Sequence, residues 1–436
     1  MRIGGLSGVA FRRHVVLLMA EPLVVRALGG RIYYGWILVL ALAISAVIGY
    51  GILTYAFPVF IAPMTGELGW SKVALTGAFS VAMLVSGVMA LPVGHWVDSY
   101  GARWTMTVGS VASVALLIAW SRVESLAGWY AIWVGLGACM AAVLYEPTFA
   151  LIANWFVRRR GRALTLLTFV GGFASVIFIP LTTLLVELYG WRAALLVLAG
   201  VMGAVTIPLH AILLRRRPED LGLVRDGEPF ALVTTGIAAR HAVRSRSFRW
   251  LATAFGLCSL ATTAASVHVI PLLLERGYHP GAAGAVMGAV GLMALPGRLV
   301  FTPLGERWSR TAVTASIFAL QAVGLGVLAI STAPAAVWMF VAFFGAGFGA
   351  ITPARAALVA DLYGAAEYGR ISGLLSLVLS LARAAAPVGA SLLYLMGGYG
   401  PVFWALLGLS VLGVLAILRA GRSNTDRSLQ LAGVTP

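Results

Sequence analysis

Charged side chains are scarce in this sequence. Only 11% of its 436 residues are Asp, Glu, Lys or Arg, and 60% are hydrophobic. A typical soluble domain has about 25% charged residues and about 45–50% apolar ones. A chain with so little charge cannot cover its apolar surface in water, which excludes a soluble globular protein. The same hydrophobicity excludes intrinsic disorder, which requires a polar composition.

Cysteine and recognisable catalytic motifs are lacking as well. Cys139 and Cys258, the two cysteines, lie in apolar stretches without a C-x-x-C motif, and we interpret both as small buried hydrophobes. There is no H-E-x-x-H, P-loop or G-x-S-x-G motif, and the six histidines are scattered. We therefore expect no enzyme, no metal site and no cofactor.

Long apolar runs are what the sequence does contain. A helix that crosses a bilayer needs about 20 mostly apolar residues, and twelve runs are long enough. They are residues 37–61, 73–93, 104–120, 129–153, 163–186, 193–214, 251–274, 282–304, 312–330, 335–360, 371–396 and 402–418. The runs are too long for strands and do not alternate with period two. We predict an all-α membrane protein of twelve transmembrane helices in two six-helix bundles.

The polar segments between these runs predict the domain organisation. We expect a cytoplasmic N-terminal tail, a first bundle, a cytoplasmic linker, a second bundle and a cytoplasmic C-terminal tail. Their respective bounds are 1–33, 34–214, 215–249, 250–419 and 420–436.

Basic residues outnumber acidic ones by 31 to 15, which gives a net charge of +16. With both termini inside, 24 of the 31 cations fall in cytoplasmic segments and only four in the opposite loops. Because Lys and Arg resist translocation, this bias predicts a cell-membrane protein with cytoplasmic termini, as in a bacterial inner membrane. A nucleic-acid partner is not expected, because the cations are spread over seven segments without a binding motif.

The two halves of the chain repeat each other at an offset of 208 residues. The matched positions are Gly69 and Gly277, Asp98 and Glu306, Gly161 and Gly369, Arg162 and Arg370, and Gly190 and Gly398. Two related halves imply a pseudo-two-fold axis along the membrane normal and a binding site at their interface.

A motif after the second run carries a family resemblance. Residues 94–103 read G-x-x-x-D-x-x-G-x-R, which resembles the signature of the major facilitator superfamily except that Ser99 replaces an Arg. A degenerate copy runs from Gly297 to Arg307 in the second half. The resemblance implies a conformational latch between the half-bundles, formed by Gly94, Asp98, Gly101, Arg103, Glu306 and Arg307.

Further segments resemble the bacterial monocarboxylate transporter and oxalate/formate antiporter branch. They are Thr54 to Pro58, Tyr145 to Pro147, Asn154 to Phe156 with Arg159 to Gly161, Gly190 to Arg192 and Arg217 to Gly222. The sequence departs from the group at Val59, where some members carry a Lys, and at Ala294, where an Asp is common.

Three arginines lie inside predicted spans. Inserting each into the membrane costs about 2.5–3.5 kcal/mol unless an acid pairs with it or water reaches it. Arg298 aligns with the substrate-binding Arg of the family, and Arg383 with a cation of the oxalate/formate branch. We expect both to bind a substrate carboxylate, since a guanidinium donates two parallel hydrogen bonds to it. For Arg298 the alternative is a structural bond to backbone carbonyls. Tyr55 and His268 are further candidates for substrate contact, although a lone His in an apolar helix is often only packing.

Glu146 is the one carboxylate deep within a span, and Arg355 lies close to its symmetry-related position. We predict that these two residues pair to close the cytoplasmic side, or that Glu146 takes up a proton, since burial favours the neutral form of a carboxyl group. The alternative is that Arg355 extends to the cytoplasm and Glu146 bonds within its own helix.

We expect a secondary active transporter of a small organic anion, a mono- or dicarboxylate. It would act as a monomer by alternating access, through proton symport or anion exchange. A second interpretation is a major facilitator exporter of a hydrophobic or cationic compound. A third, from a different class, is an intramembrane enzyme or receptor. The sequence leaves open the substrate, the direction of transport and the coupling ion.

Overall fold

The computed structural model describes residues 33–227 and 238–431, and these ranges contain helices and no strand. The first bundle comprises α3 (Tyr34–Tyr50), a π-helical turn (Gly51–Tyr55), α4 (Phe57–Leu68), α5 (Lys72–Tyr100), α6 (Ala102–Ser121), α7 (Leu126–Val143), α8 (Tyr145–Trp155), α9 (Arg160–Gly171) and α10 (Ala174–Pro208). The second comprises α12 (Arg246–Glu275), α13 (Pro280–Arg307), α14 (Arg310–Ile330), α15 (Pro334–Tyr363), α16 (Tyr368–Gly397) and α17 (Tyr399–Leu431).

A linker joins the two bundles on one side of the molecule. It begins with a π-helical turn (Leu209–Leu213), continues through a 3₁₀ turn (Pro218–Leu221) and ends with the short helix α11 (Ala239–Arg244). We call this end of the molecule the linker side and the other end the opposite side. The backbone amide of Ala239 donates to Glu367 Oε2 at 2.6 Å, which fixes α11 beside the start of α16.

Eleven helical stretches in the described ranges are long and apolar enough to cross a membrane. One of them, residues 160–213, is 54 residues long and contains Gly190 with φ 76°, where the helix turns back. That stretch therefore crosses twice, which gives the twelve passes that the apolar runs predict. The all-α membrane fold is confirmed.

The helix bounds repeat at the offset found in the sequence. Residues 102, 126 and 160, which begin α6, α7 and α9, correspond to residues 310, 334 and 368, which begin α14, α15 and α16. Gly69 and Gly277 both have positive φ, as do Gly190 and Gly398. Glycine is required at such positions because a side chain rarely adopts this conformation. The same turns therefore end corresponding helices in the two halves.

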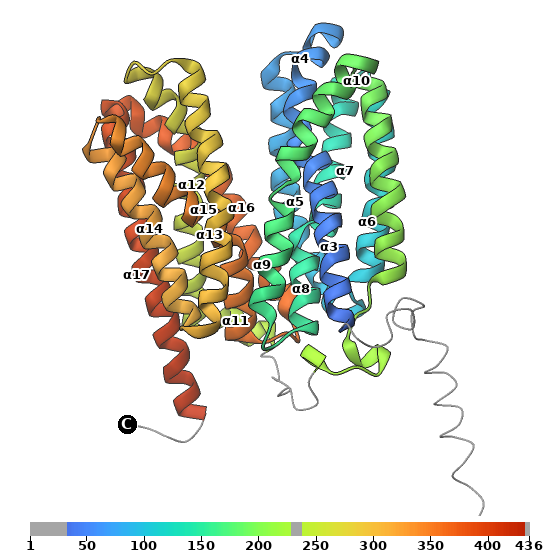
Figure 1. The fold of residues 1–436 in the computed structure, drawn as a ribbon, viewed down its shortest axis with the longest axis vertical. Coiled ribbons are helices and arrows are strands. Elements are labelled where there is room, and N and C mark those ends of the chain that lie inside the picture. The colour runs from blue at the N-terminus through green and yellow to red at the C-terminus, as the bar shows by residue number, and fades with distance from the viewer. Residues whose placement is uncertain (1–32, 228–237, 432–436) are drawn as a thin grey trace, which may run out of the picture.

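Figure 1 shows the two bundles side by side, meeting around α8 and α9 at the linker side and diverging toward the opposite side. At the meeting point α5 and α16 approach to backbone contact. A Cβ on Gly94 would lie 2.0 Å from the carbonyl oxygen of Gly369, and one on Gly373 would lie 2.3 Å from that of Ala90. Only glycine permits this approach, because any side chain at these positions would overlap the facing backbone. Gly94 and Gly373 therefore allow the two bundles to pack closely on the linker side.

Candidate functional site

Glu146 stands at a helix start in the middle of the protein. The chain leaves helical geometry at Leu144, with φ −87° and ψ −147°, and α8 begins at Tyr145. Glu146 therefore occupies the first turn of α8, where unpaired backbone N–H groups and the helix dipole stabilise a carboxylate. Pro147 is tolerated there because a first-turn residue needs no N–H partner.

The Glu146 carboxylate binds three side chains from the second bundle. Arg355 Nη2 donates to its Oε1 at 2.7 Å, Ser376 Oγ donates to the same oxygen at 2.5 Å, and Ser372 Oγ donates to Oε2 at 2.6 Å. Arg355 Nη1 also donates to Ser376 Oγ at 3.0 Å. Only 19% of the Glu146 side chain and 10% of the Arg355 side chain is exposed. We call these four residues the carboxylate cluster; it ties α8 to α15 and α16.

The two serines of this cluster are functional candidates that the sequence reasoning missed. Ser372 and Ser376 are four residues apart on α16, so they share one helix face. Two hydroxyls at that spacing, near the start of an otherwise apolar span, are the signal that could have identified them. The two hydroxyls donate to the Glu146 oxygens in addition to the single Arg355. A buried carboxylate requires such hydrogen-bond donors.

Arg298 joins the bundles through backbone oxygens rather than through an acid. Its Nη1 donates to the carbonyl of Thr168 on α9 at 2.6 Å, and its Nε donates to that of Gly349 on α15 at 3.1 Å. The Gly349 carbonyl is available because the residue four positions later is Pro353, which has no N–H. The arrangement corresponds to the carbonyl alternative that the sequence left open, and the substrate-binding role of Arg298 stays a prediction.

The motif residue Asp98 bonds to the start of a helix in the other bundle. Its Oδ1 accepts from the backbone N–H of Gly369 and its Oδ2 from that of Arg370, both at 2.8 Å. Arg370 Nε lies 2.6 Å from His95 Nδ1. Asp98 thus satisfies N–H groups of the first turn of α16 that have no partner inside the helix.

The other motif residues have different surroundings. The Arg103 guanidinium lies 5.3 Å from the ring centre of Trp104, and its Nε has no hydrogen-bond partner among the described residues. The linker's Arg216 donates to the backbone carbonyl of Asp98 at 2.6 Å. Arg307 is exposed at the end of α13, and the side chain of Glu306 lies outside the described residues.

A further bridge between the bundles was not foreseen. Arg160 Nη1 donates to Asp361 Oδ1 at 2.8 Å, and Arg310 pairs with the other oxygen of Asp361. Arg160 is 3% exposed and comes from the first bundle, whereas Asp361 and Arg310 belong to the second. The contacts of Arg160, Asp98, Arg298 and Glu146 all lie on the linker side. No hydrogen bond or ion pair between described residues joins the bundles on the opposite side.

Arg383 lies at mid-helix, nearer the opposite side. It is seven residues beyond Ser376 on α16, which is about 10 Å along the helix axis. Its side chain is exposed, its Nε donates to Ser259 Oγ at 3.1 Å, and no acid pairs with it among the described residues. Its charge is close enough to interact with Arg355 and with Tyr50 and Glu146 of the first bundle, so it faces the interface. Among the described residues, Arg383 Nη1 and Nη2 have no hydrogen-bond partner.

Tyr50 of the first bundle lies near this position, and Tyr55 and Tyr145 lie near Tyr50. The rings of Tyr50 and Tyr145 lie 4.5 Å apart, and 38% of Tyr55 is exposed at the end of the π-helical turn. His268 is placed differently. It is 8% exposed, its Nε2 lies 3.3 Å from the carbonyl oxygen of Pro387, and its ring lies 5.9 Å from that of Tyr399. These His268 contacts lie within the second bundle.

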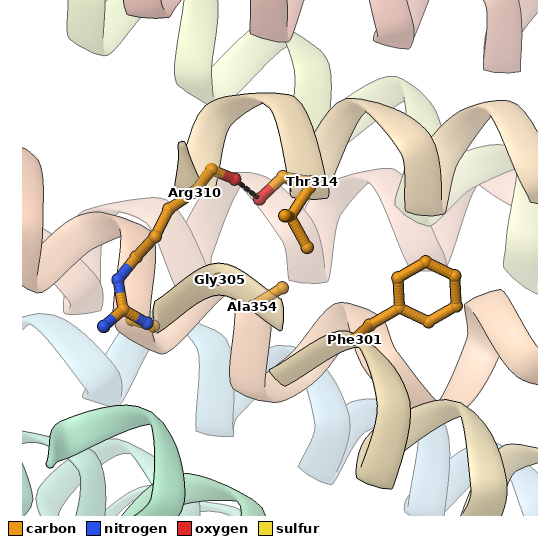
Figure 2. A pocket seen from close by; sticks show the side chains of 7 residues that line it. Phe301, Gly305, Arg310, Thr314 and Ala354 are labelled. Atoms are coloured by element: carbon orange, nitrogen blue, oxygen red, sulfur yellow. Dashed lines mark hydrogen bonds between the residues drawn. The ribbon is translucent and has the colours of Figure 1, made fainter. Parts of the chain in front are cut away.

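Figure 2 shows a small hollow between α13, α14 and α15. It is lined by Phe301, Gly305, Arg310, Val313, Thr314, Ala354 and Ala357, and Thr314 Oγ1 donates to the Arg310 carbonyl at 2.7 Å. The hollow contains none of the residues that the sequence singled out. It belongs to the packing of the second bundle.

Comparisons with known proteins agree with this architecture. The chain is 25% identical over 378 residues to monocarboxylate transporter 13 of Bos taurus, covering 85% of each chain. It is 23% identical over 340 residues to the uncharacterized MFS-type transporter YcxA of Bacillus subtilis, covering 75% of this chain and 80% of the other. The crystal structure of FucP in the outward conformation matches the fold with a TM-score of 0.70 at 13% identity, covering 89% of this chain and 99% of that one.

The model of the Major Facilitator Superfamily matches residues 39–387 and, again, residues 257–433. The homologues and structural neighbours are membrane transporters rather than enzymes. The matched region includes both bundles and the motif around Asp98. It also includes Glu146, Arg298, Arg355 and Arg383. This chain therefore belongs to the Major Facilitator Superfamily of membrane transporters.

Proposed function

We propose that the protein is a secondary transporter of a small organic anion, a mono- or dicarboxylate, that works by alternating access. One observation carries the proposal: Arg383 is an exposed cation at mid-helix, without an acidic partner in the described ranges, at the interface of the two bundles. A cation in that position is costly unless water or an anion reaches it. The similarity to monocarboxylate transporters supports an anionic cargo.

Arg383 has the geometry for carboxylate recognition. Its Nε is held by Ser259, which orients the planar guanidinium and leaves Nη1 and Nη2 for the ligand. A carboxylate accepts two parallel hydrogen bonds from such a group, which a Lys at the same place would not supply. The neighbouring Tyr50 and Tyr55 supply hydroxyl groups and apolar ring faces for the remainder of the cargo.

In the conformation that the structure shows, the contacts between the bundles on the linker side act as a closed gate. Access from that side requires the carboxylate cluster, the Asp98 contacts and the Arg298 bond to Thr168 to break together. Rocking of one bundle against the other does this without unfolding either, as in other transporters built from repeats. Arg298 is then released from Thr168, and we propose that it contacts the cargo in the alternate state.

The linker side is proposed to be cytoplasmic, in a bacterial inner membrane, from the distribution of basic residues. Coupling is proposed to use either symported protons or a counter-anion. Glu146 is the candidate proton acceptor: while the gate is closed its oxygens are occupied by Arg355 and two serines, and they become accessible when the bundles separate.

Uptake of labelled mono- and dicarboxylates into proteoliposomes, with and without a pH gradient, tests the proposal. We expect at least one carboxylate to accumulate, and Arg383→Gln to abolish the accumulation. Arg122→Gln is the matched control because Arg122 is an exposed cation at the end of α6, outside the interface. Accumulation of no carboxylate under any gradient, or equal uptake by Arg383→Gln, contradicts the proposed function.

A further inference from the structure

The start of α12 and the end of α17 form a basic surface that the transport mechanism does not use. Four exposed arginines gather there: Arg246 and Arg249 on α12, and Arg419 and Arg422 on α17. The two helix ends are joined by a hydrogen bond from Ser247 Oγ to the carbonyl of Ala420 at 3.0 Å.

None of these four arginines has an ion-pair partner among the described residues. Three acids on the linker side have partners elsewhere: Asp98 accepts from the start of α16, Asp361 pairs with two arginines, and Glu367 binds Arg370 and the backbone of α11. The next acid along α17 is Asp426, whose side chain lies outside the described residues. Within the part of the chain that the structure describes, the surface therefore carries four positive charges without an acidic partner at one end of the second bundle.

An aromatic ring lies within the same surface. The guanidinium carbon of Arg419 is 5.1 Å from the ring centre of Trp250, a cation–π contact. Trp is favoured at the boundary between the hydrocarbon and the headgroups, where an apolar ring and a polar N–H are both accommodated. Trp250 thus marks the level at which α12 leaves the hydrocarbon.

The exposed face of α17 changes character along its length. Val411, Leu412, Leu415 and Leu418 are between 40% and 53% exposed, and Arg419 and Arg422 continue the same helical face. An apolar stripe that ends in cations matches a phospholipid, whose acyl chains lie along the stripe and whose phosphate lies at the arginines. Figure 1 shows that the end of α17 extends past the neighbouring helices on this side.

We propose that this surface binds an anionic phospholipid of the leaflet at the linker side. The phosphate lies between the arginines of α12 and α17, and the acyl chains pack against residues 411–418 of α17. Each Arg near an anionic membrane surface strengthens such binding about fivefold. The bound lipid braces two helix ends of the second bundle.

Thermal unfolding of the purified full chain in detergent, with added phosphatidylglycerol or phosphatidylcholine, tests the proposal. We expect phosphatidylglycerol to raise the Tm more than phosphatidylcholine does. Arg419→Gln with Arg422→Gln should remove at least half of this difference, and Arg246→Gln with Arg249→Gln should do the same. High salt should also remove it, because the contact is electrostatic and exposed.

Two control variants sharpen the result. Lys72→Gln with Arg122→Gln removes two exposed cations from the opposite side and should retain the full difference. Arg419→Lys with Arg422→Lys keeps the charge and should retain most of it. The proposal is overturned by an equal Tm rise with both lipids, by equal losses in patch and control variants, or by inorganic phosphate reproducing the rise.

Discussion

The two bundles share one repeat, yet their helices differ at mid-membrane. In the first bundle the helices depart from regular α-helical geometry at the π-helical turn 51–55, at Leu144 and at residues 172–173. The corresponding helices of the second bundle, α12, α15 and α16, are continuous. At Leu144, which leaves helical φ/ψ, the first turn of α8 begins with N–H groups that have no partner inside the helix. In the second bundle Pro353 frees a carbonyl instead, that of Gly349, so the two bundles present different kinds of backbone group.

The charges follow the same division. Glu146 belongs to the first bundle, whereas Arg298, Arg355 and Arg383 all belong to the second. At the symmetry-related positions stand Ala354, Ala90, Pro147 and Ser175, so none of these charges has a copy in the other half. The turns of the repeat match between the halves, whereas these four charges do not. Glu146 of the first bundle pairs with Arg355 of the second, and Arg160 and Asp361 form a second pair in the opposite sense.

The strongest way to break this complementarity is Arg355→Gln. It leaves the Glu146 carboxylate nearly buried with only two hydroxyl donors, and loss of one partner of a buried pair costs about 3–5 kcal/mol. We expect a large drop in Tm, with partial recovery when Glu146→Gln is added. Arg122→Gln, which removes an exposed cation at the end of α6, should change the free energy of unfolding by at most about 0.5 kcal/mol. Equal Tm values for both single variants would contradict the assignment.

Arg383→Gln should lower ligand affinity without weakening the contacts that close the linker side. We expect carboxylate affinity, measured by calorimetry on the purified protein, to fall about 10- to 100-fold, because hydrogen bonds to a charged group contribute about 1.5–3 kcal/mol. The Tm should stay near that of the wild type, since Arg383 makes a single side-chain hydrogen bond. A large Tm loss without an affinity change would make Arg383 structural instead.

The backbone approach of α5 and α16 is tested by Gly94→Ala. The added methyl group would overlap the Gly369 carbonyl, and overpacking of this kind costs about 1–3 kcal/mol. The matched control is Gly284→Ala on α13, where a Cβ meets nothing within 4 Å. There the Tm should hold or rise, because Ala favours a helix over Gly by up to about 1 kcal/mol. Similar Tm changes in both variants would argue against the close approach.

Pro353→Ala gives the smallest expected effect. It returns an N–H to the Gly349 carbonyl, which then competes with Arg298 for that oxygen. A hydrogen bond is worth about 0.5–1.5 kcal/mol, so we expect transport turnover to change roughly two- to tenfold with little change in Tm. Unaltered turnover would show that the Arg298 contact with Gly349 does not restrain the gate.

The sequence predicted the features that depend on short stretches of neighbouring residues. Twelve apolar runs, their turns and the 208-residue repeat follow from hydropathy and from glycines with positive φ, and the structure bears them out. The charged residues of the interface, among them Glu146, Arg298, Arg355 and Arg383, stood out because charge inside a span is expensive. Ser372 and Ser376 did not stand out, because a hydroxyl in a helix normally bonds its own backbone.

The sequence by itself therefore determined the membrane fold, the pairing of the halves and the short list of intramembrane charges, since burial costs act on each segment alone. Only the tertiary structure decided their partners. Whether Arg298 bonds a carbonyl or faces the interface depends on Pro353 and Thr168, which lie on two other helices. Whether Glu146 is satisfied depends on α15 and α16 of the other bundle. Such contacts join residues about 130–230 positions apart, and no local pattern encodes the relative placement of two bundles.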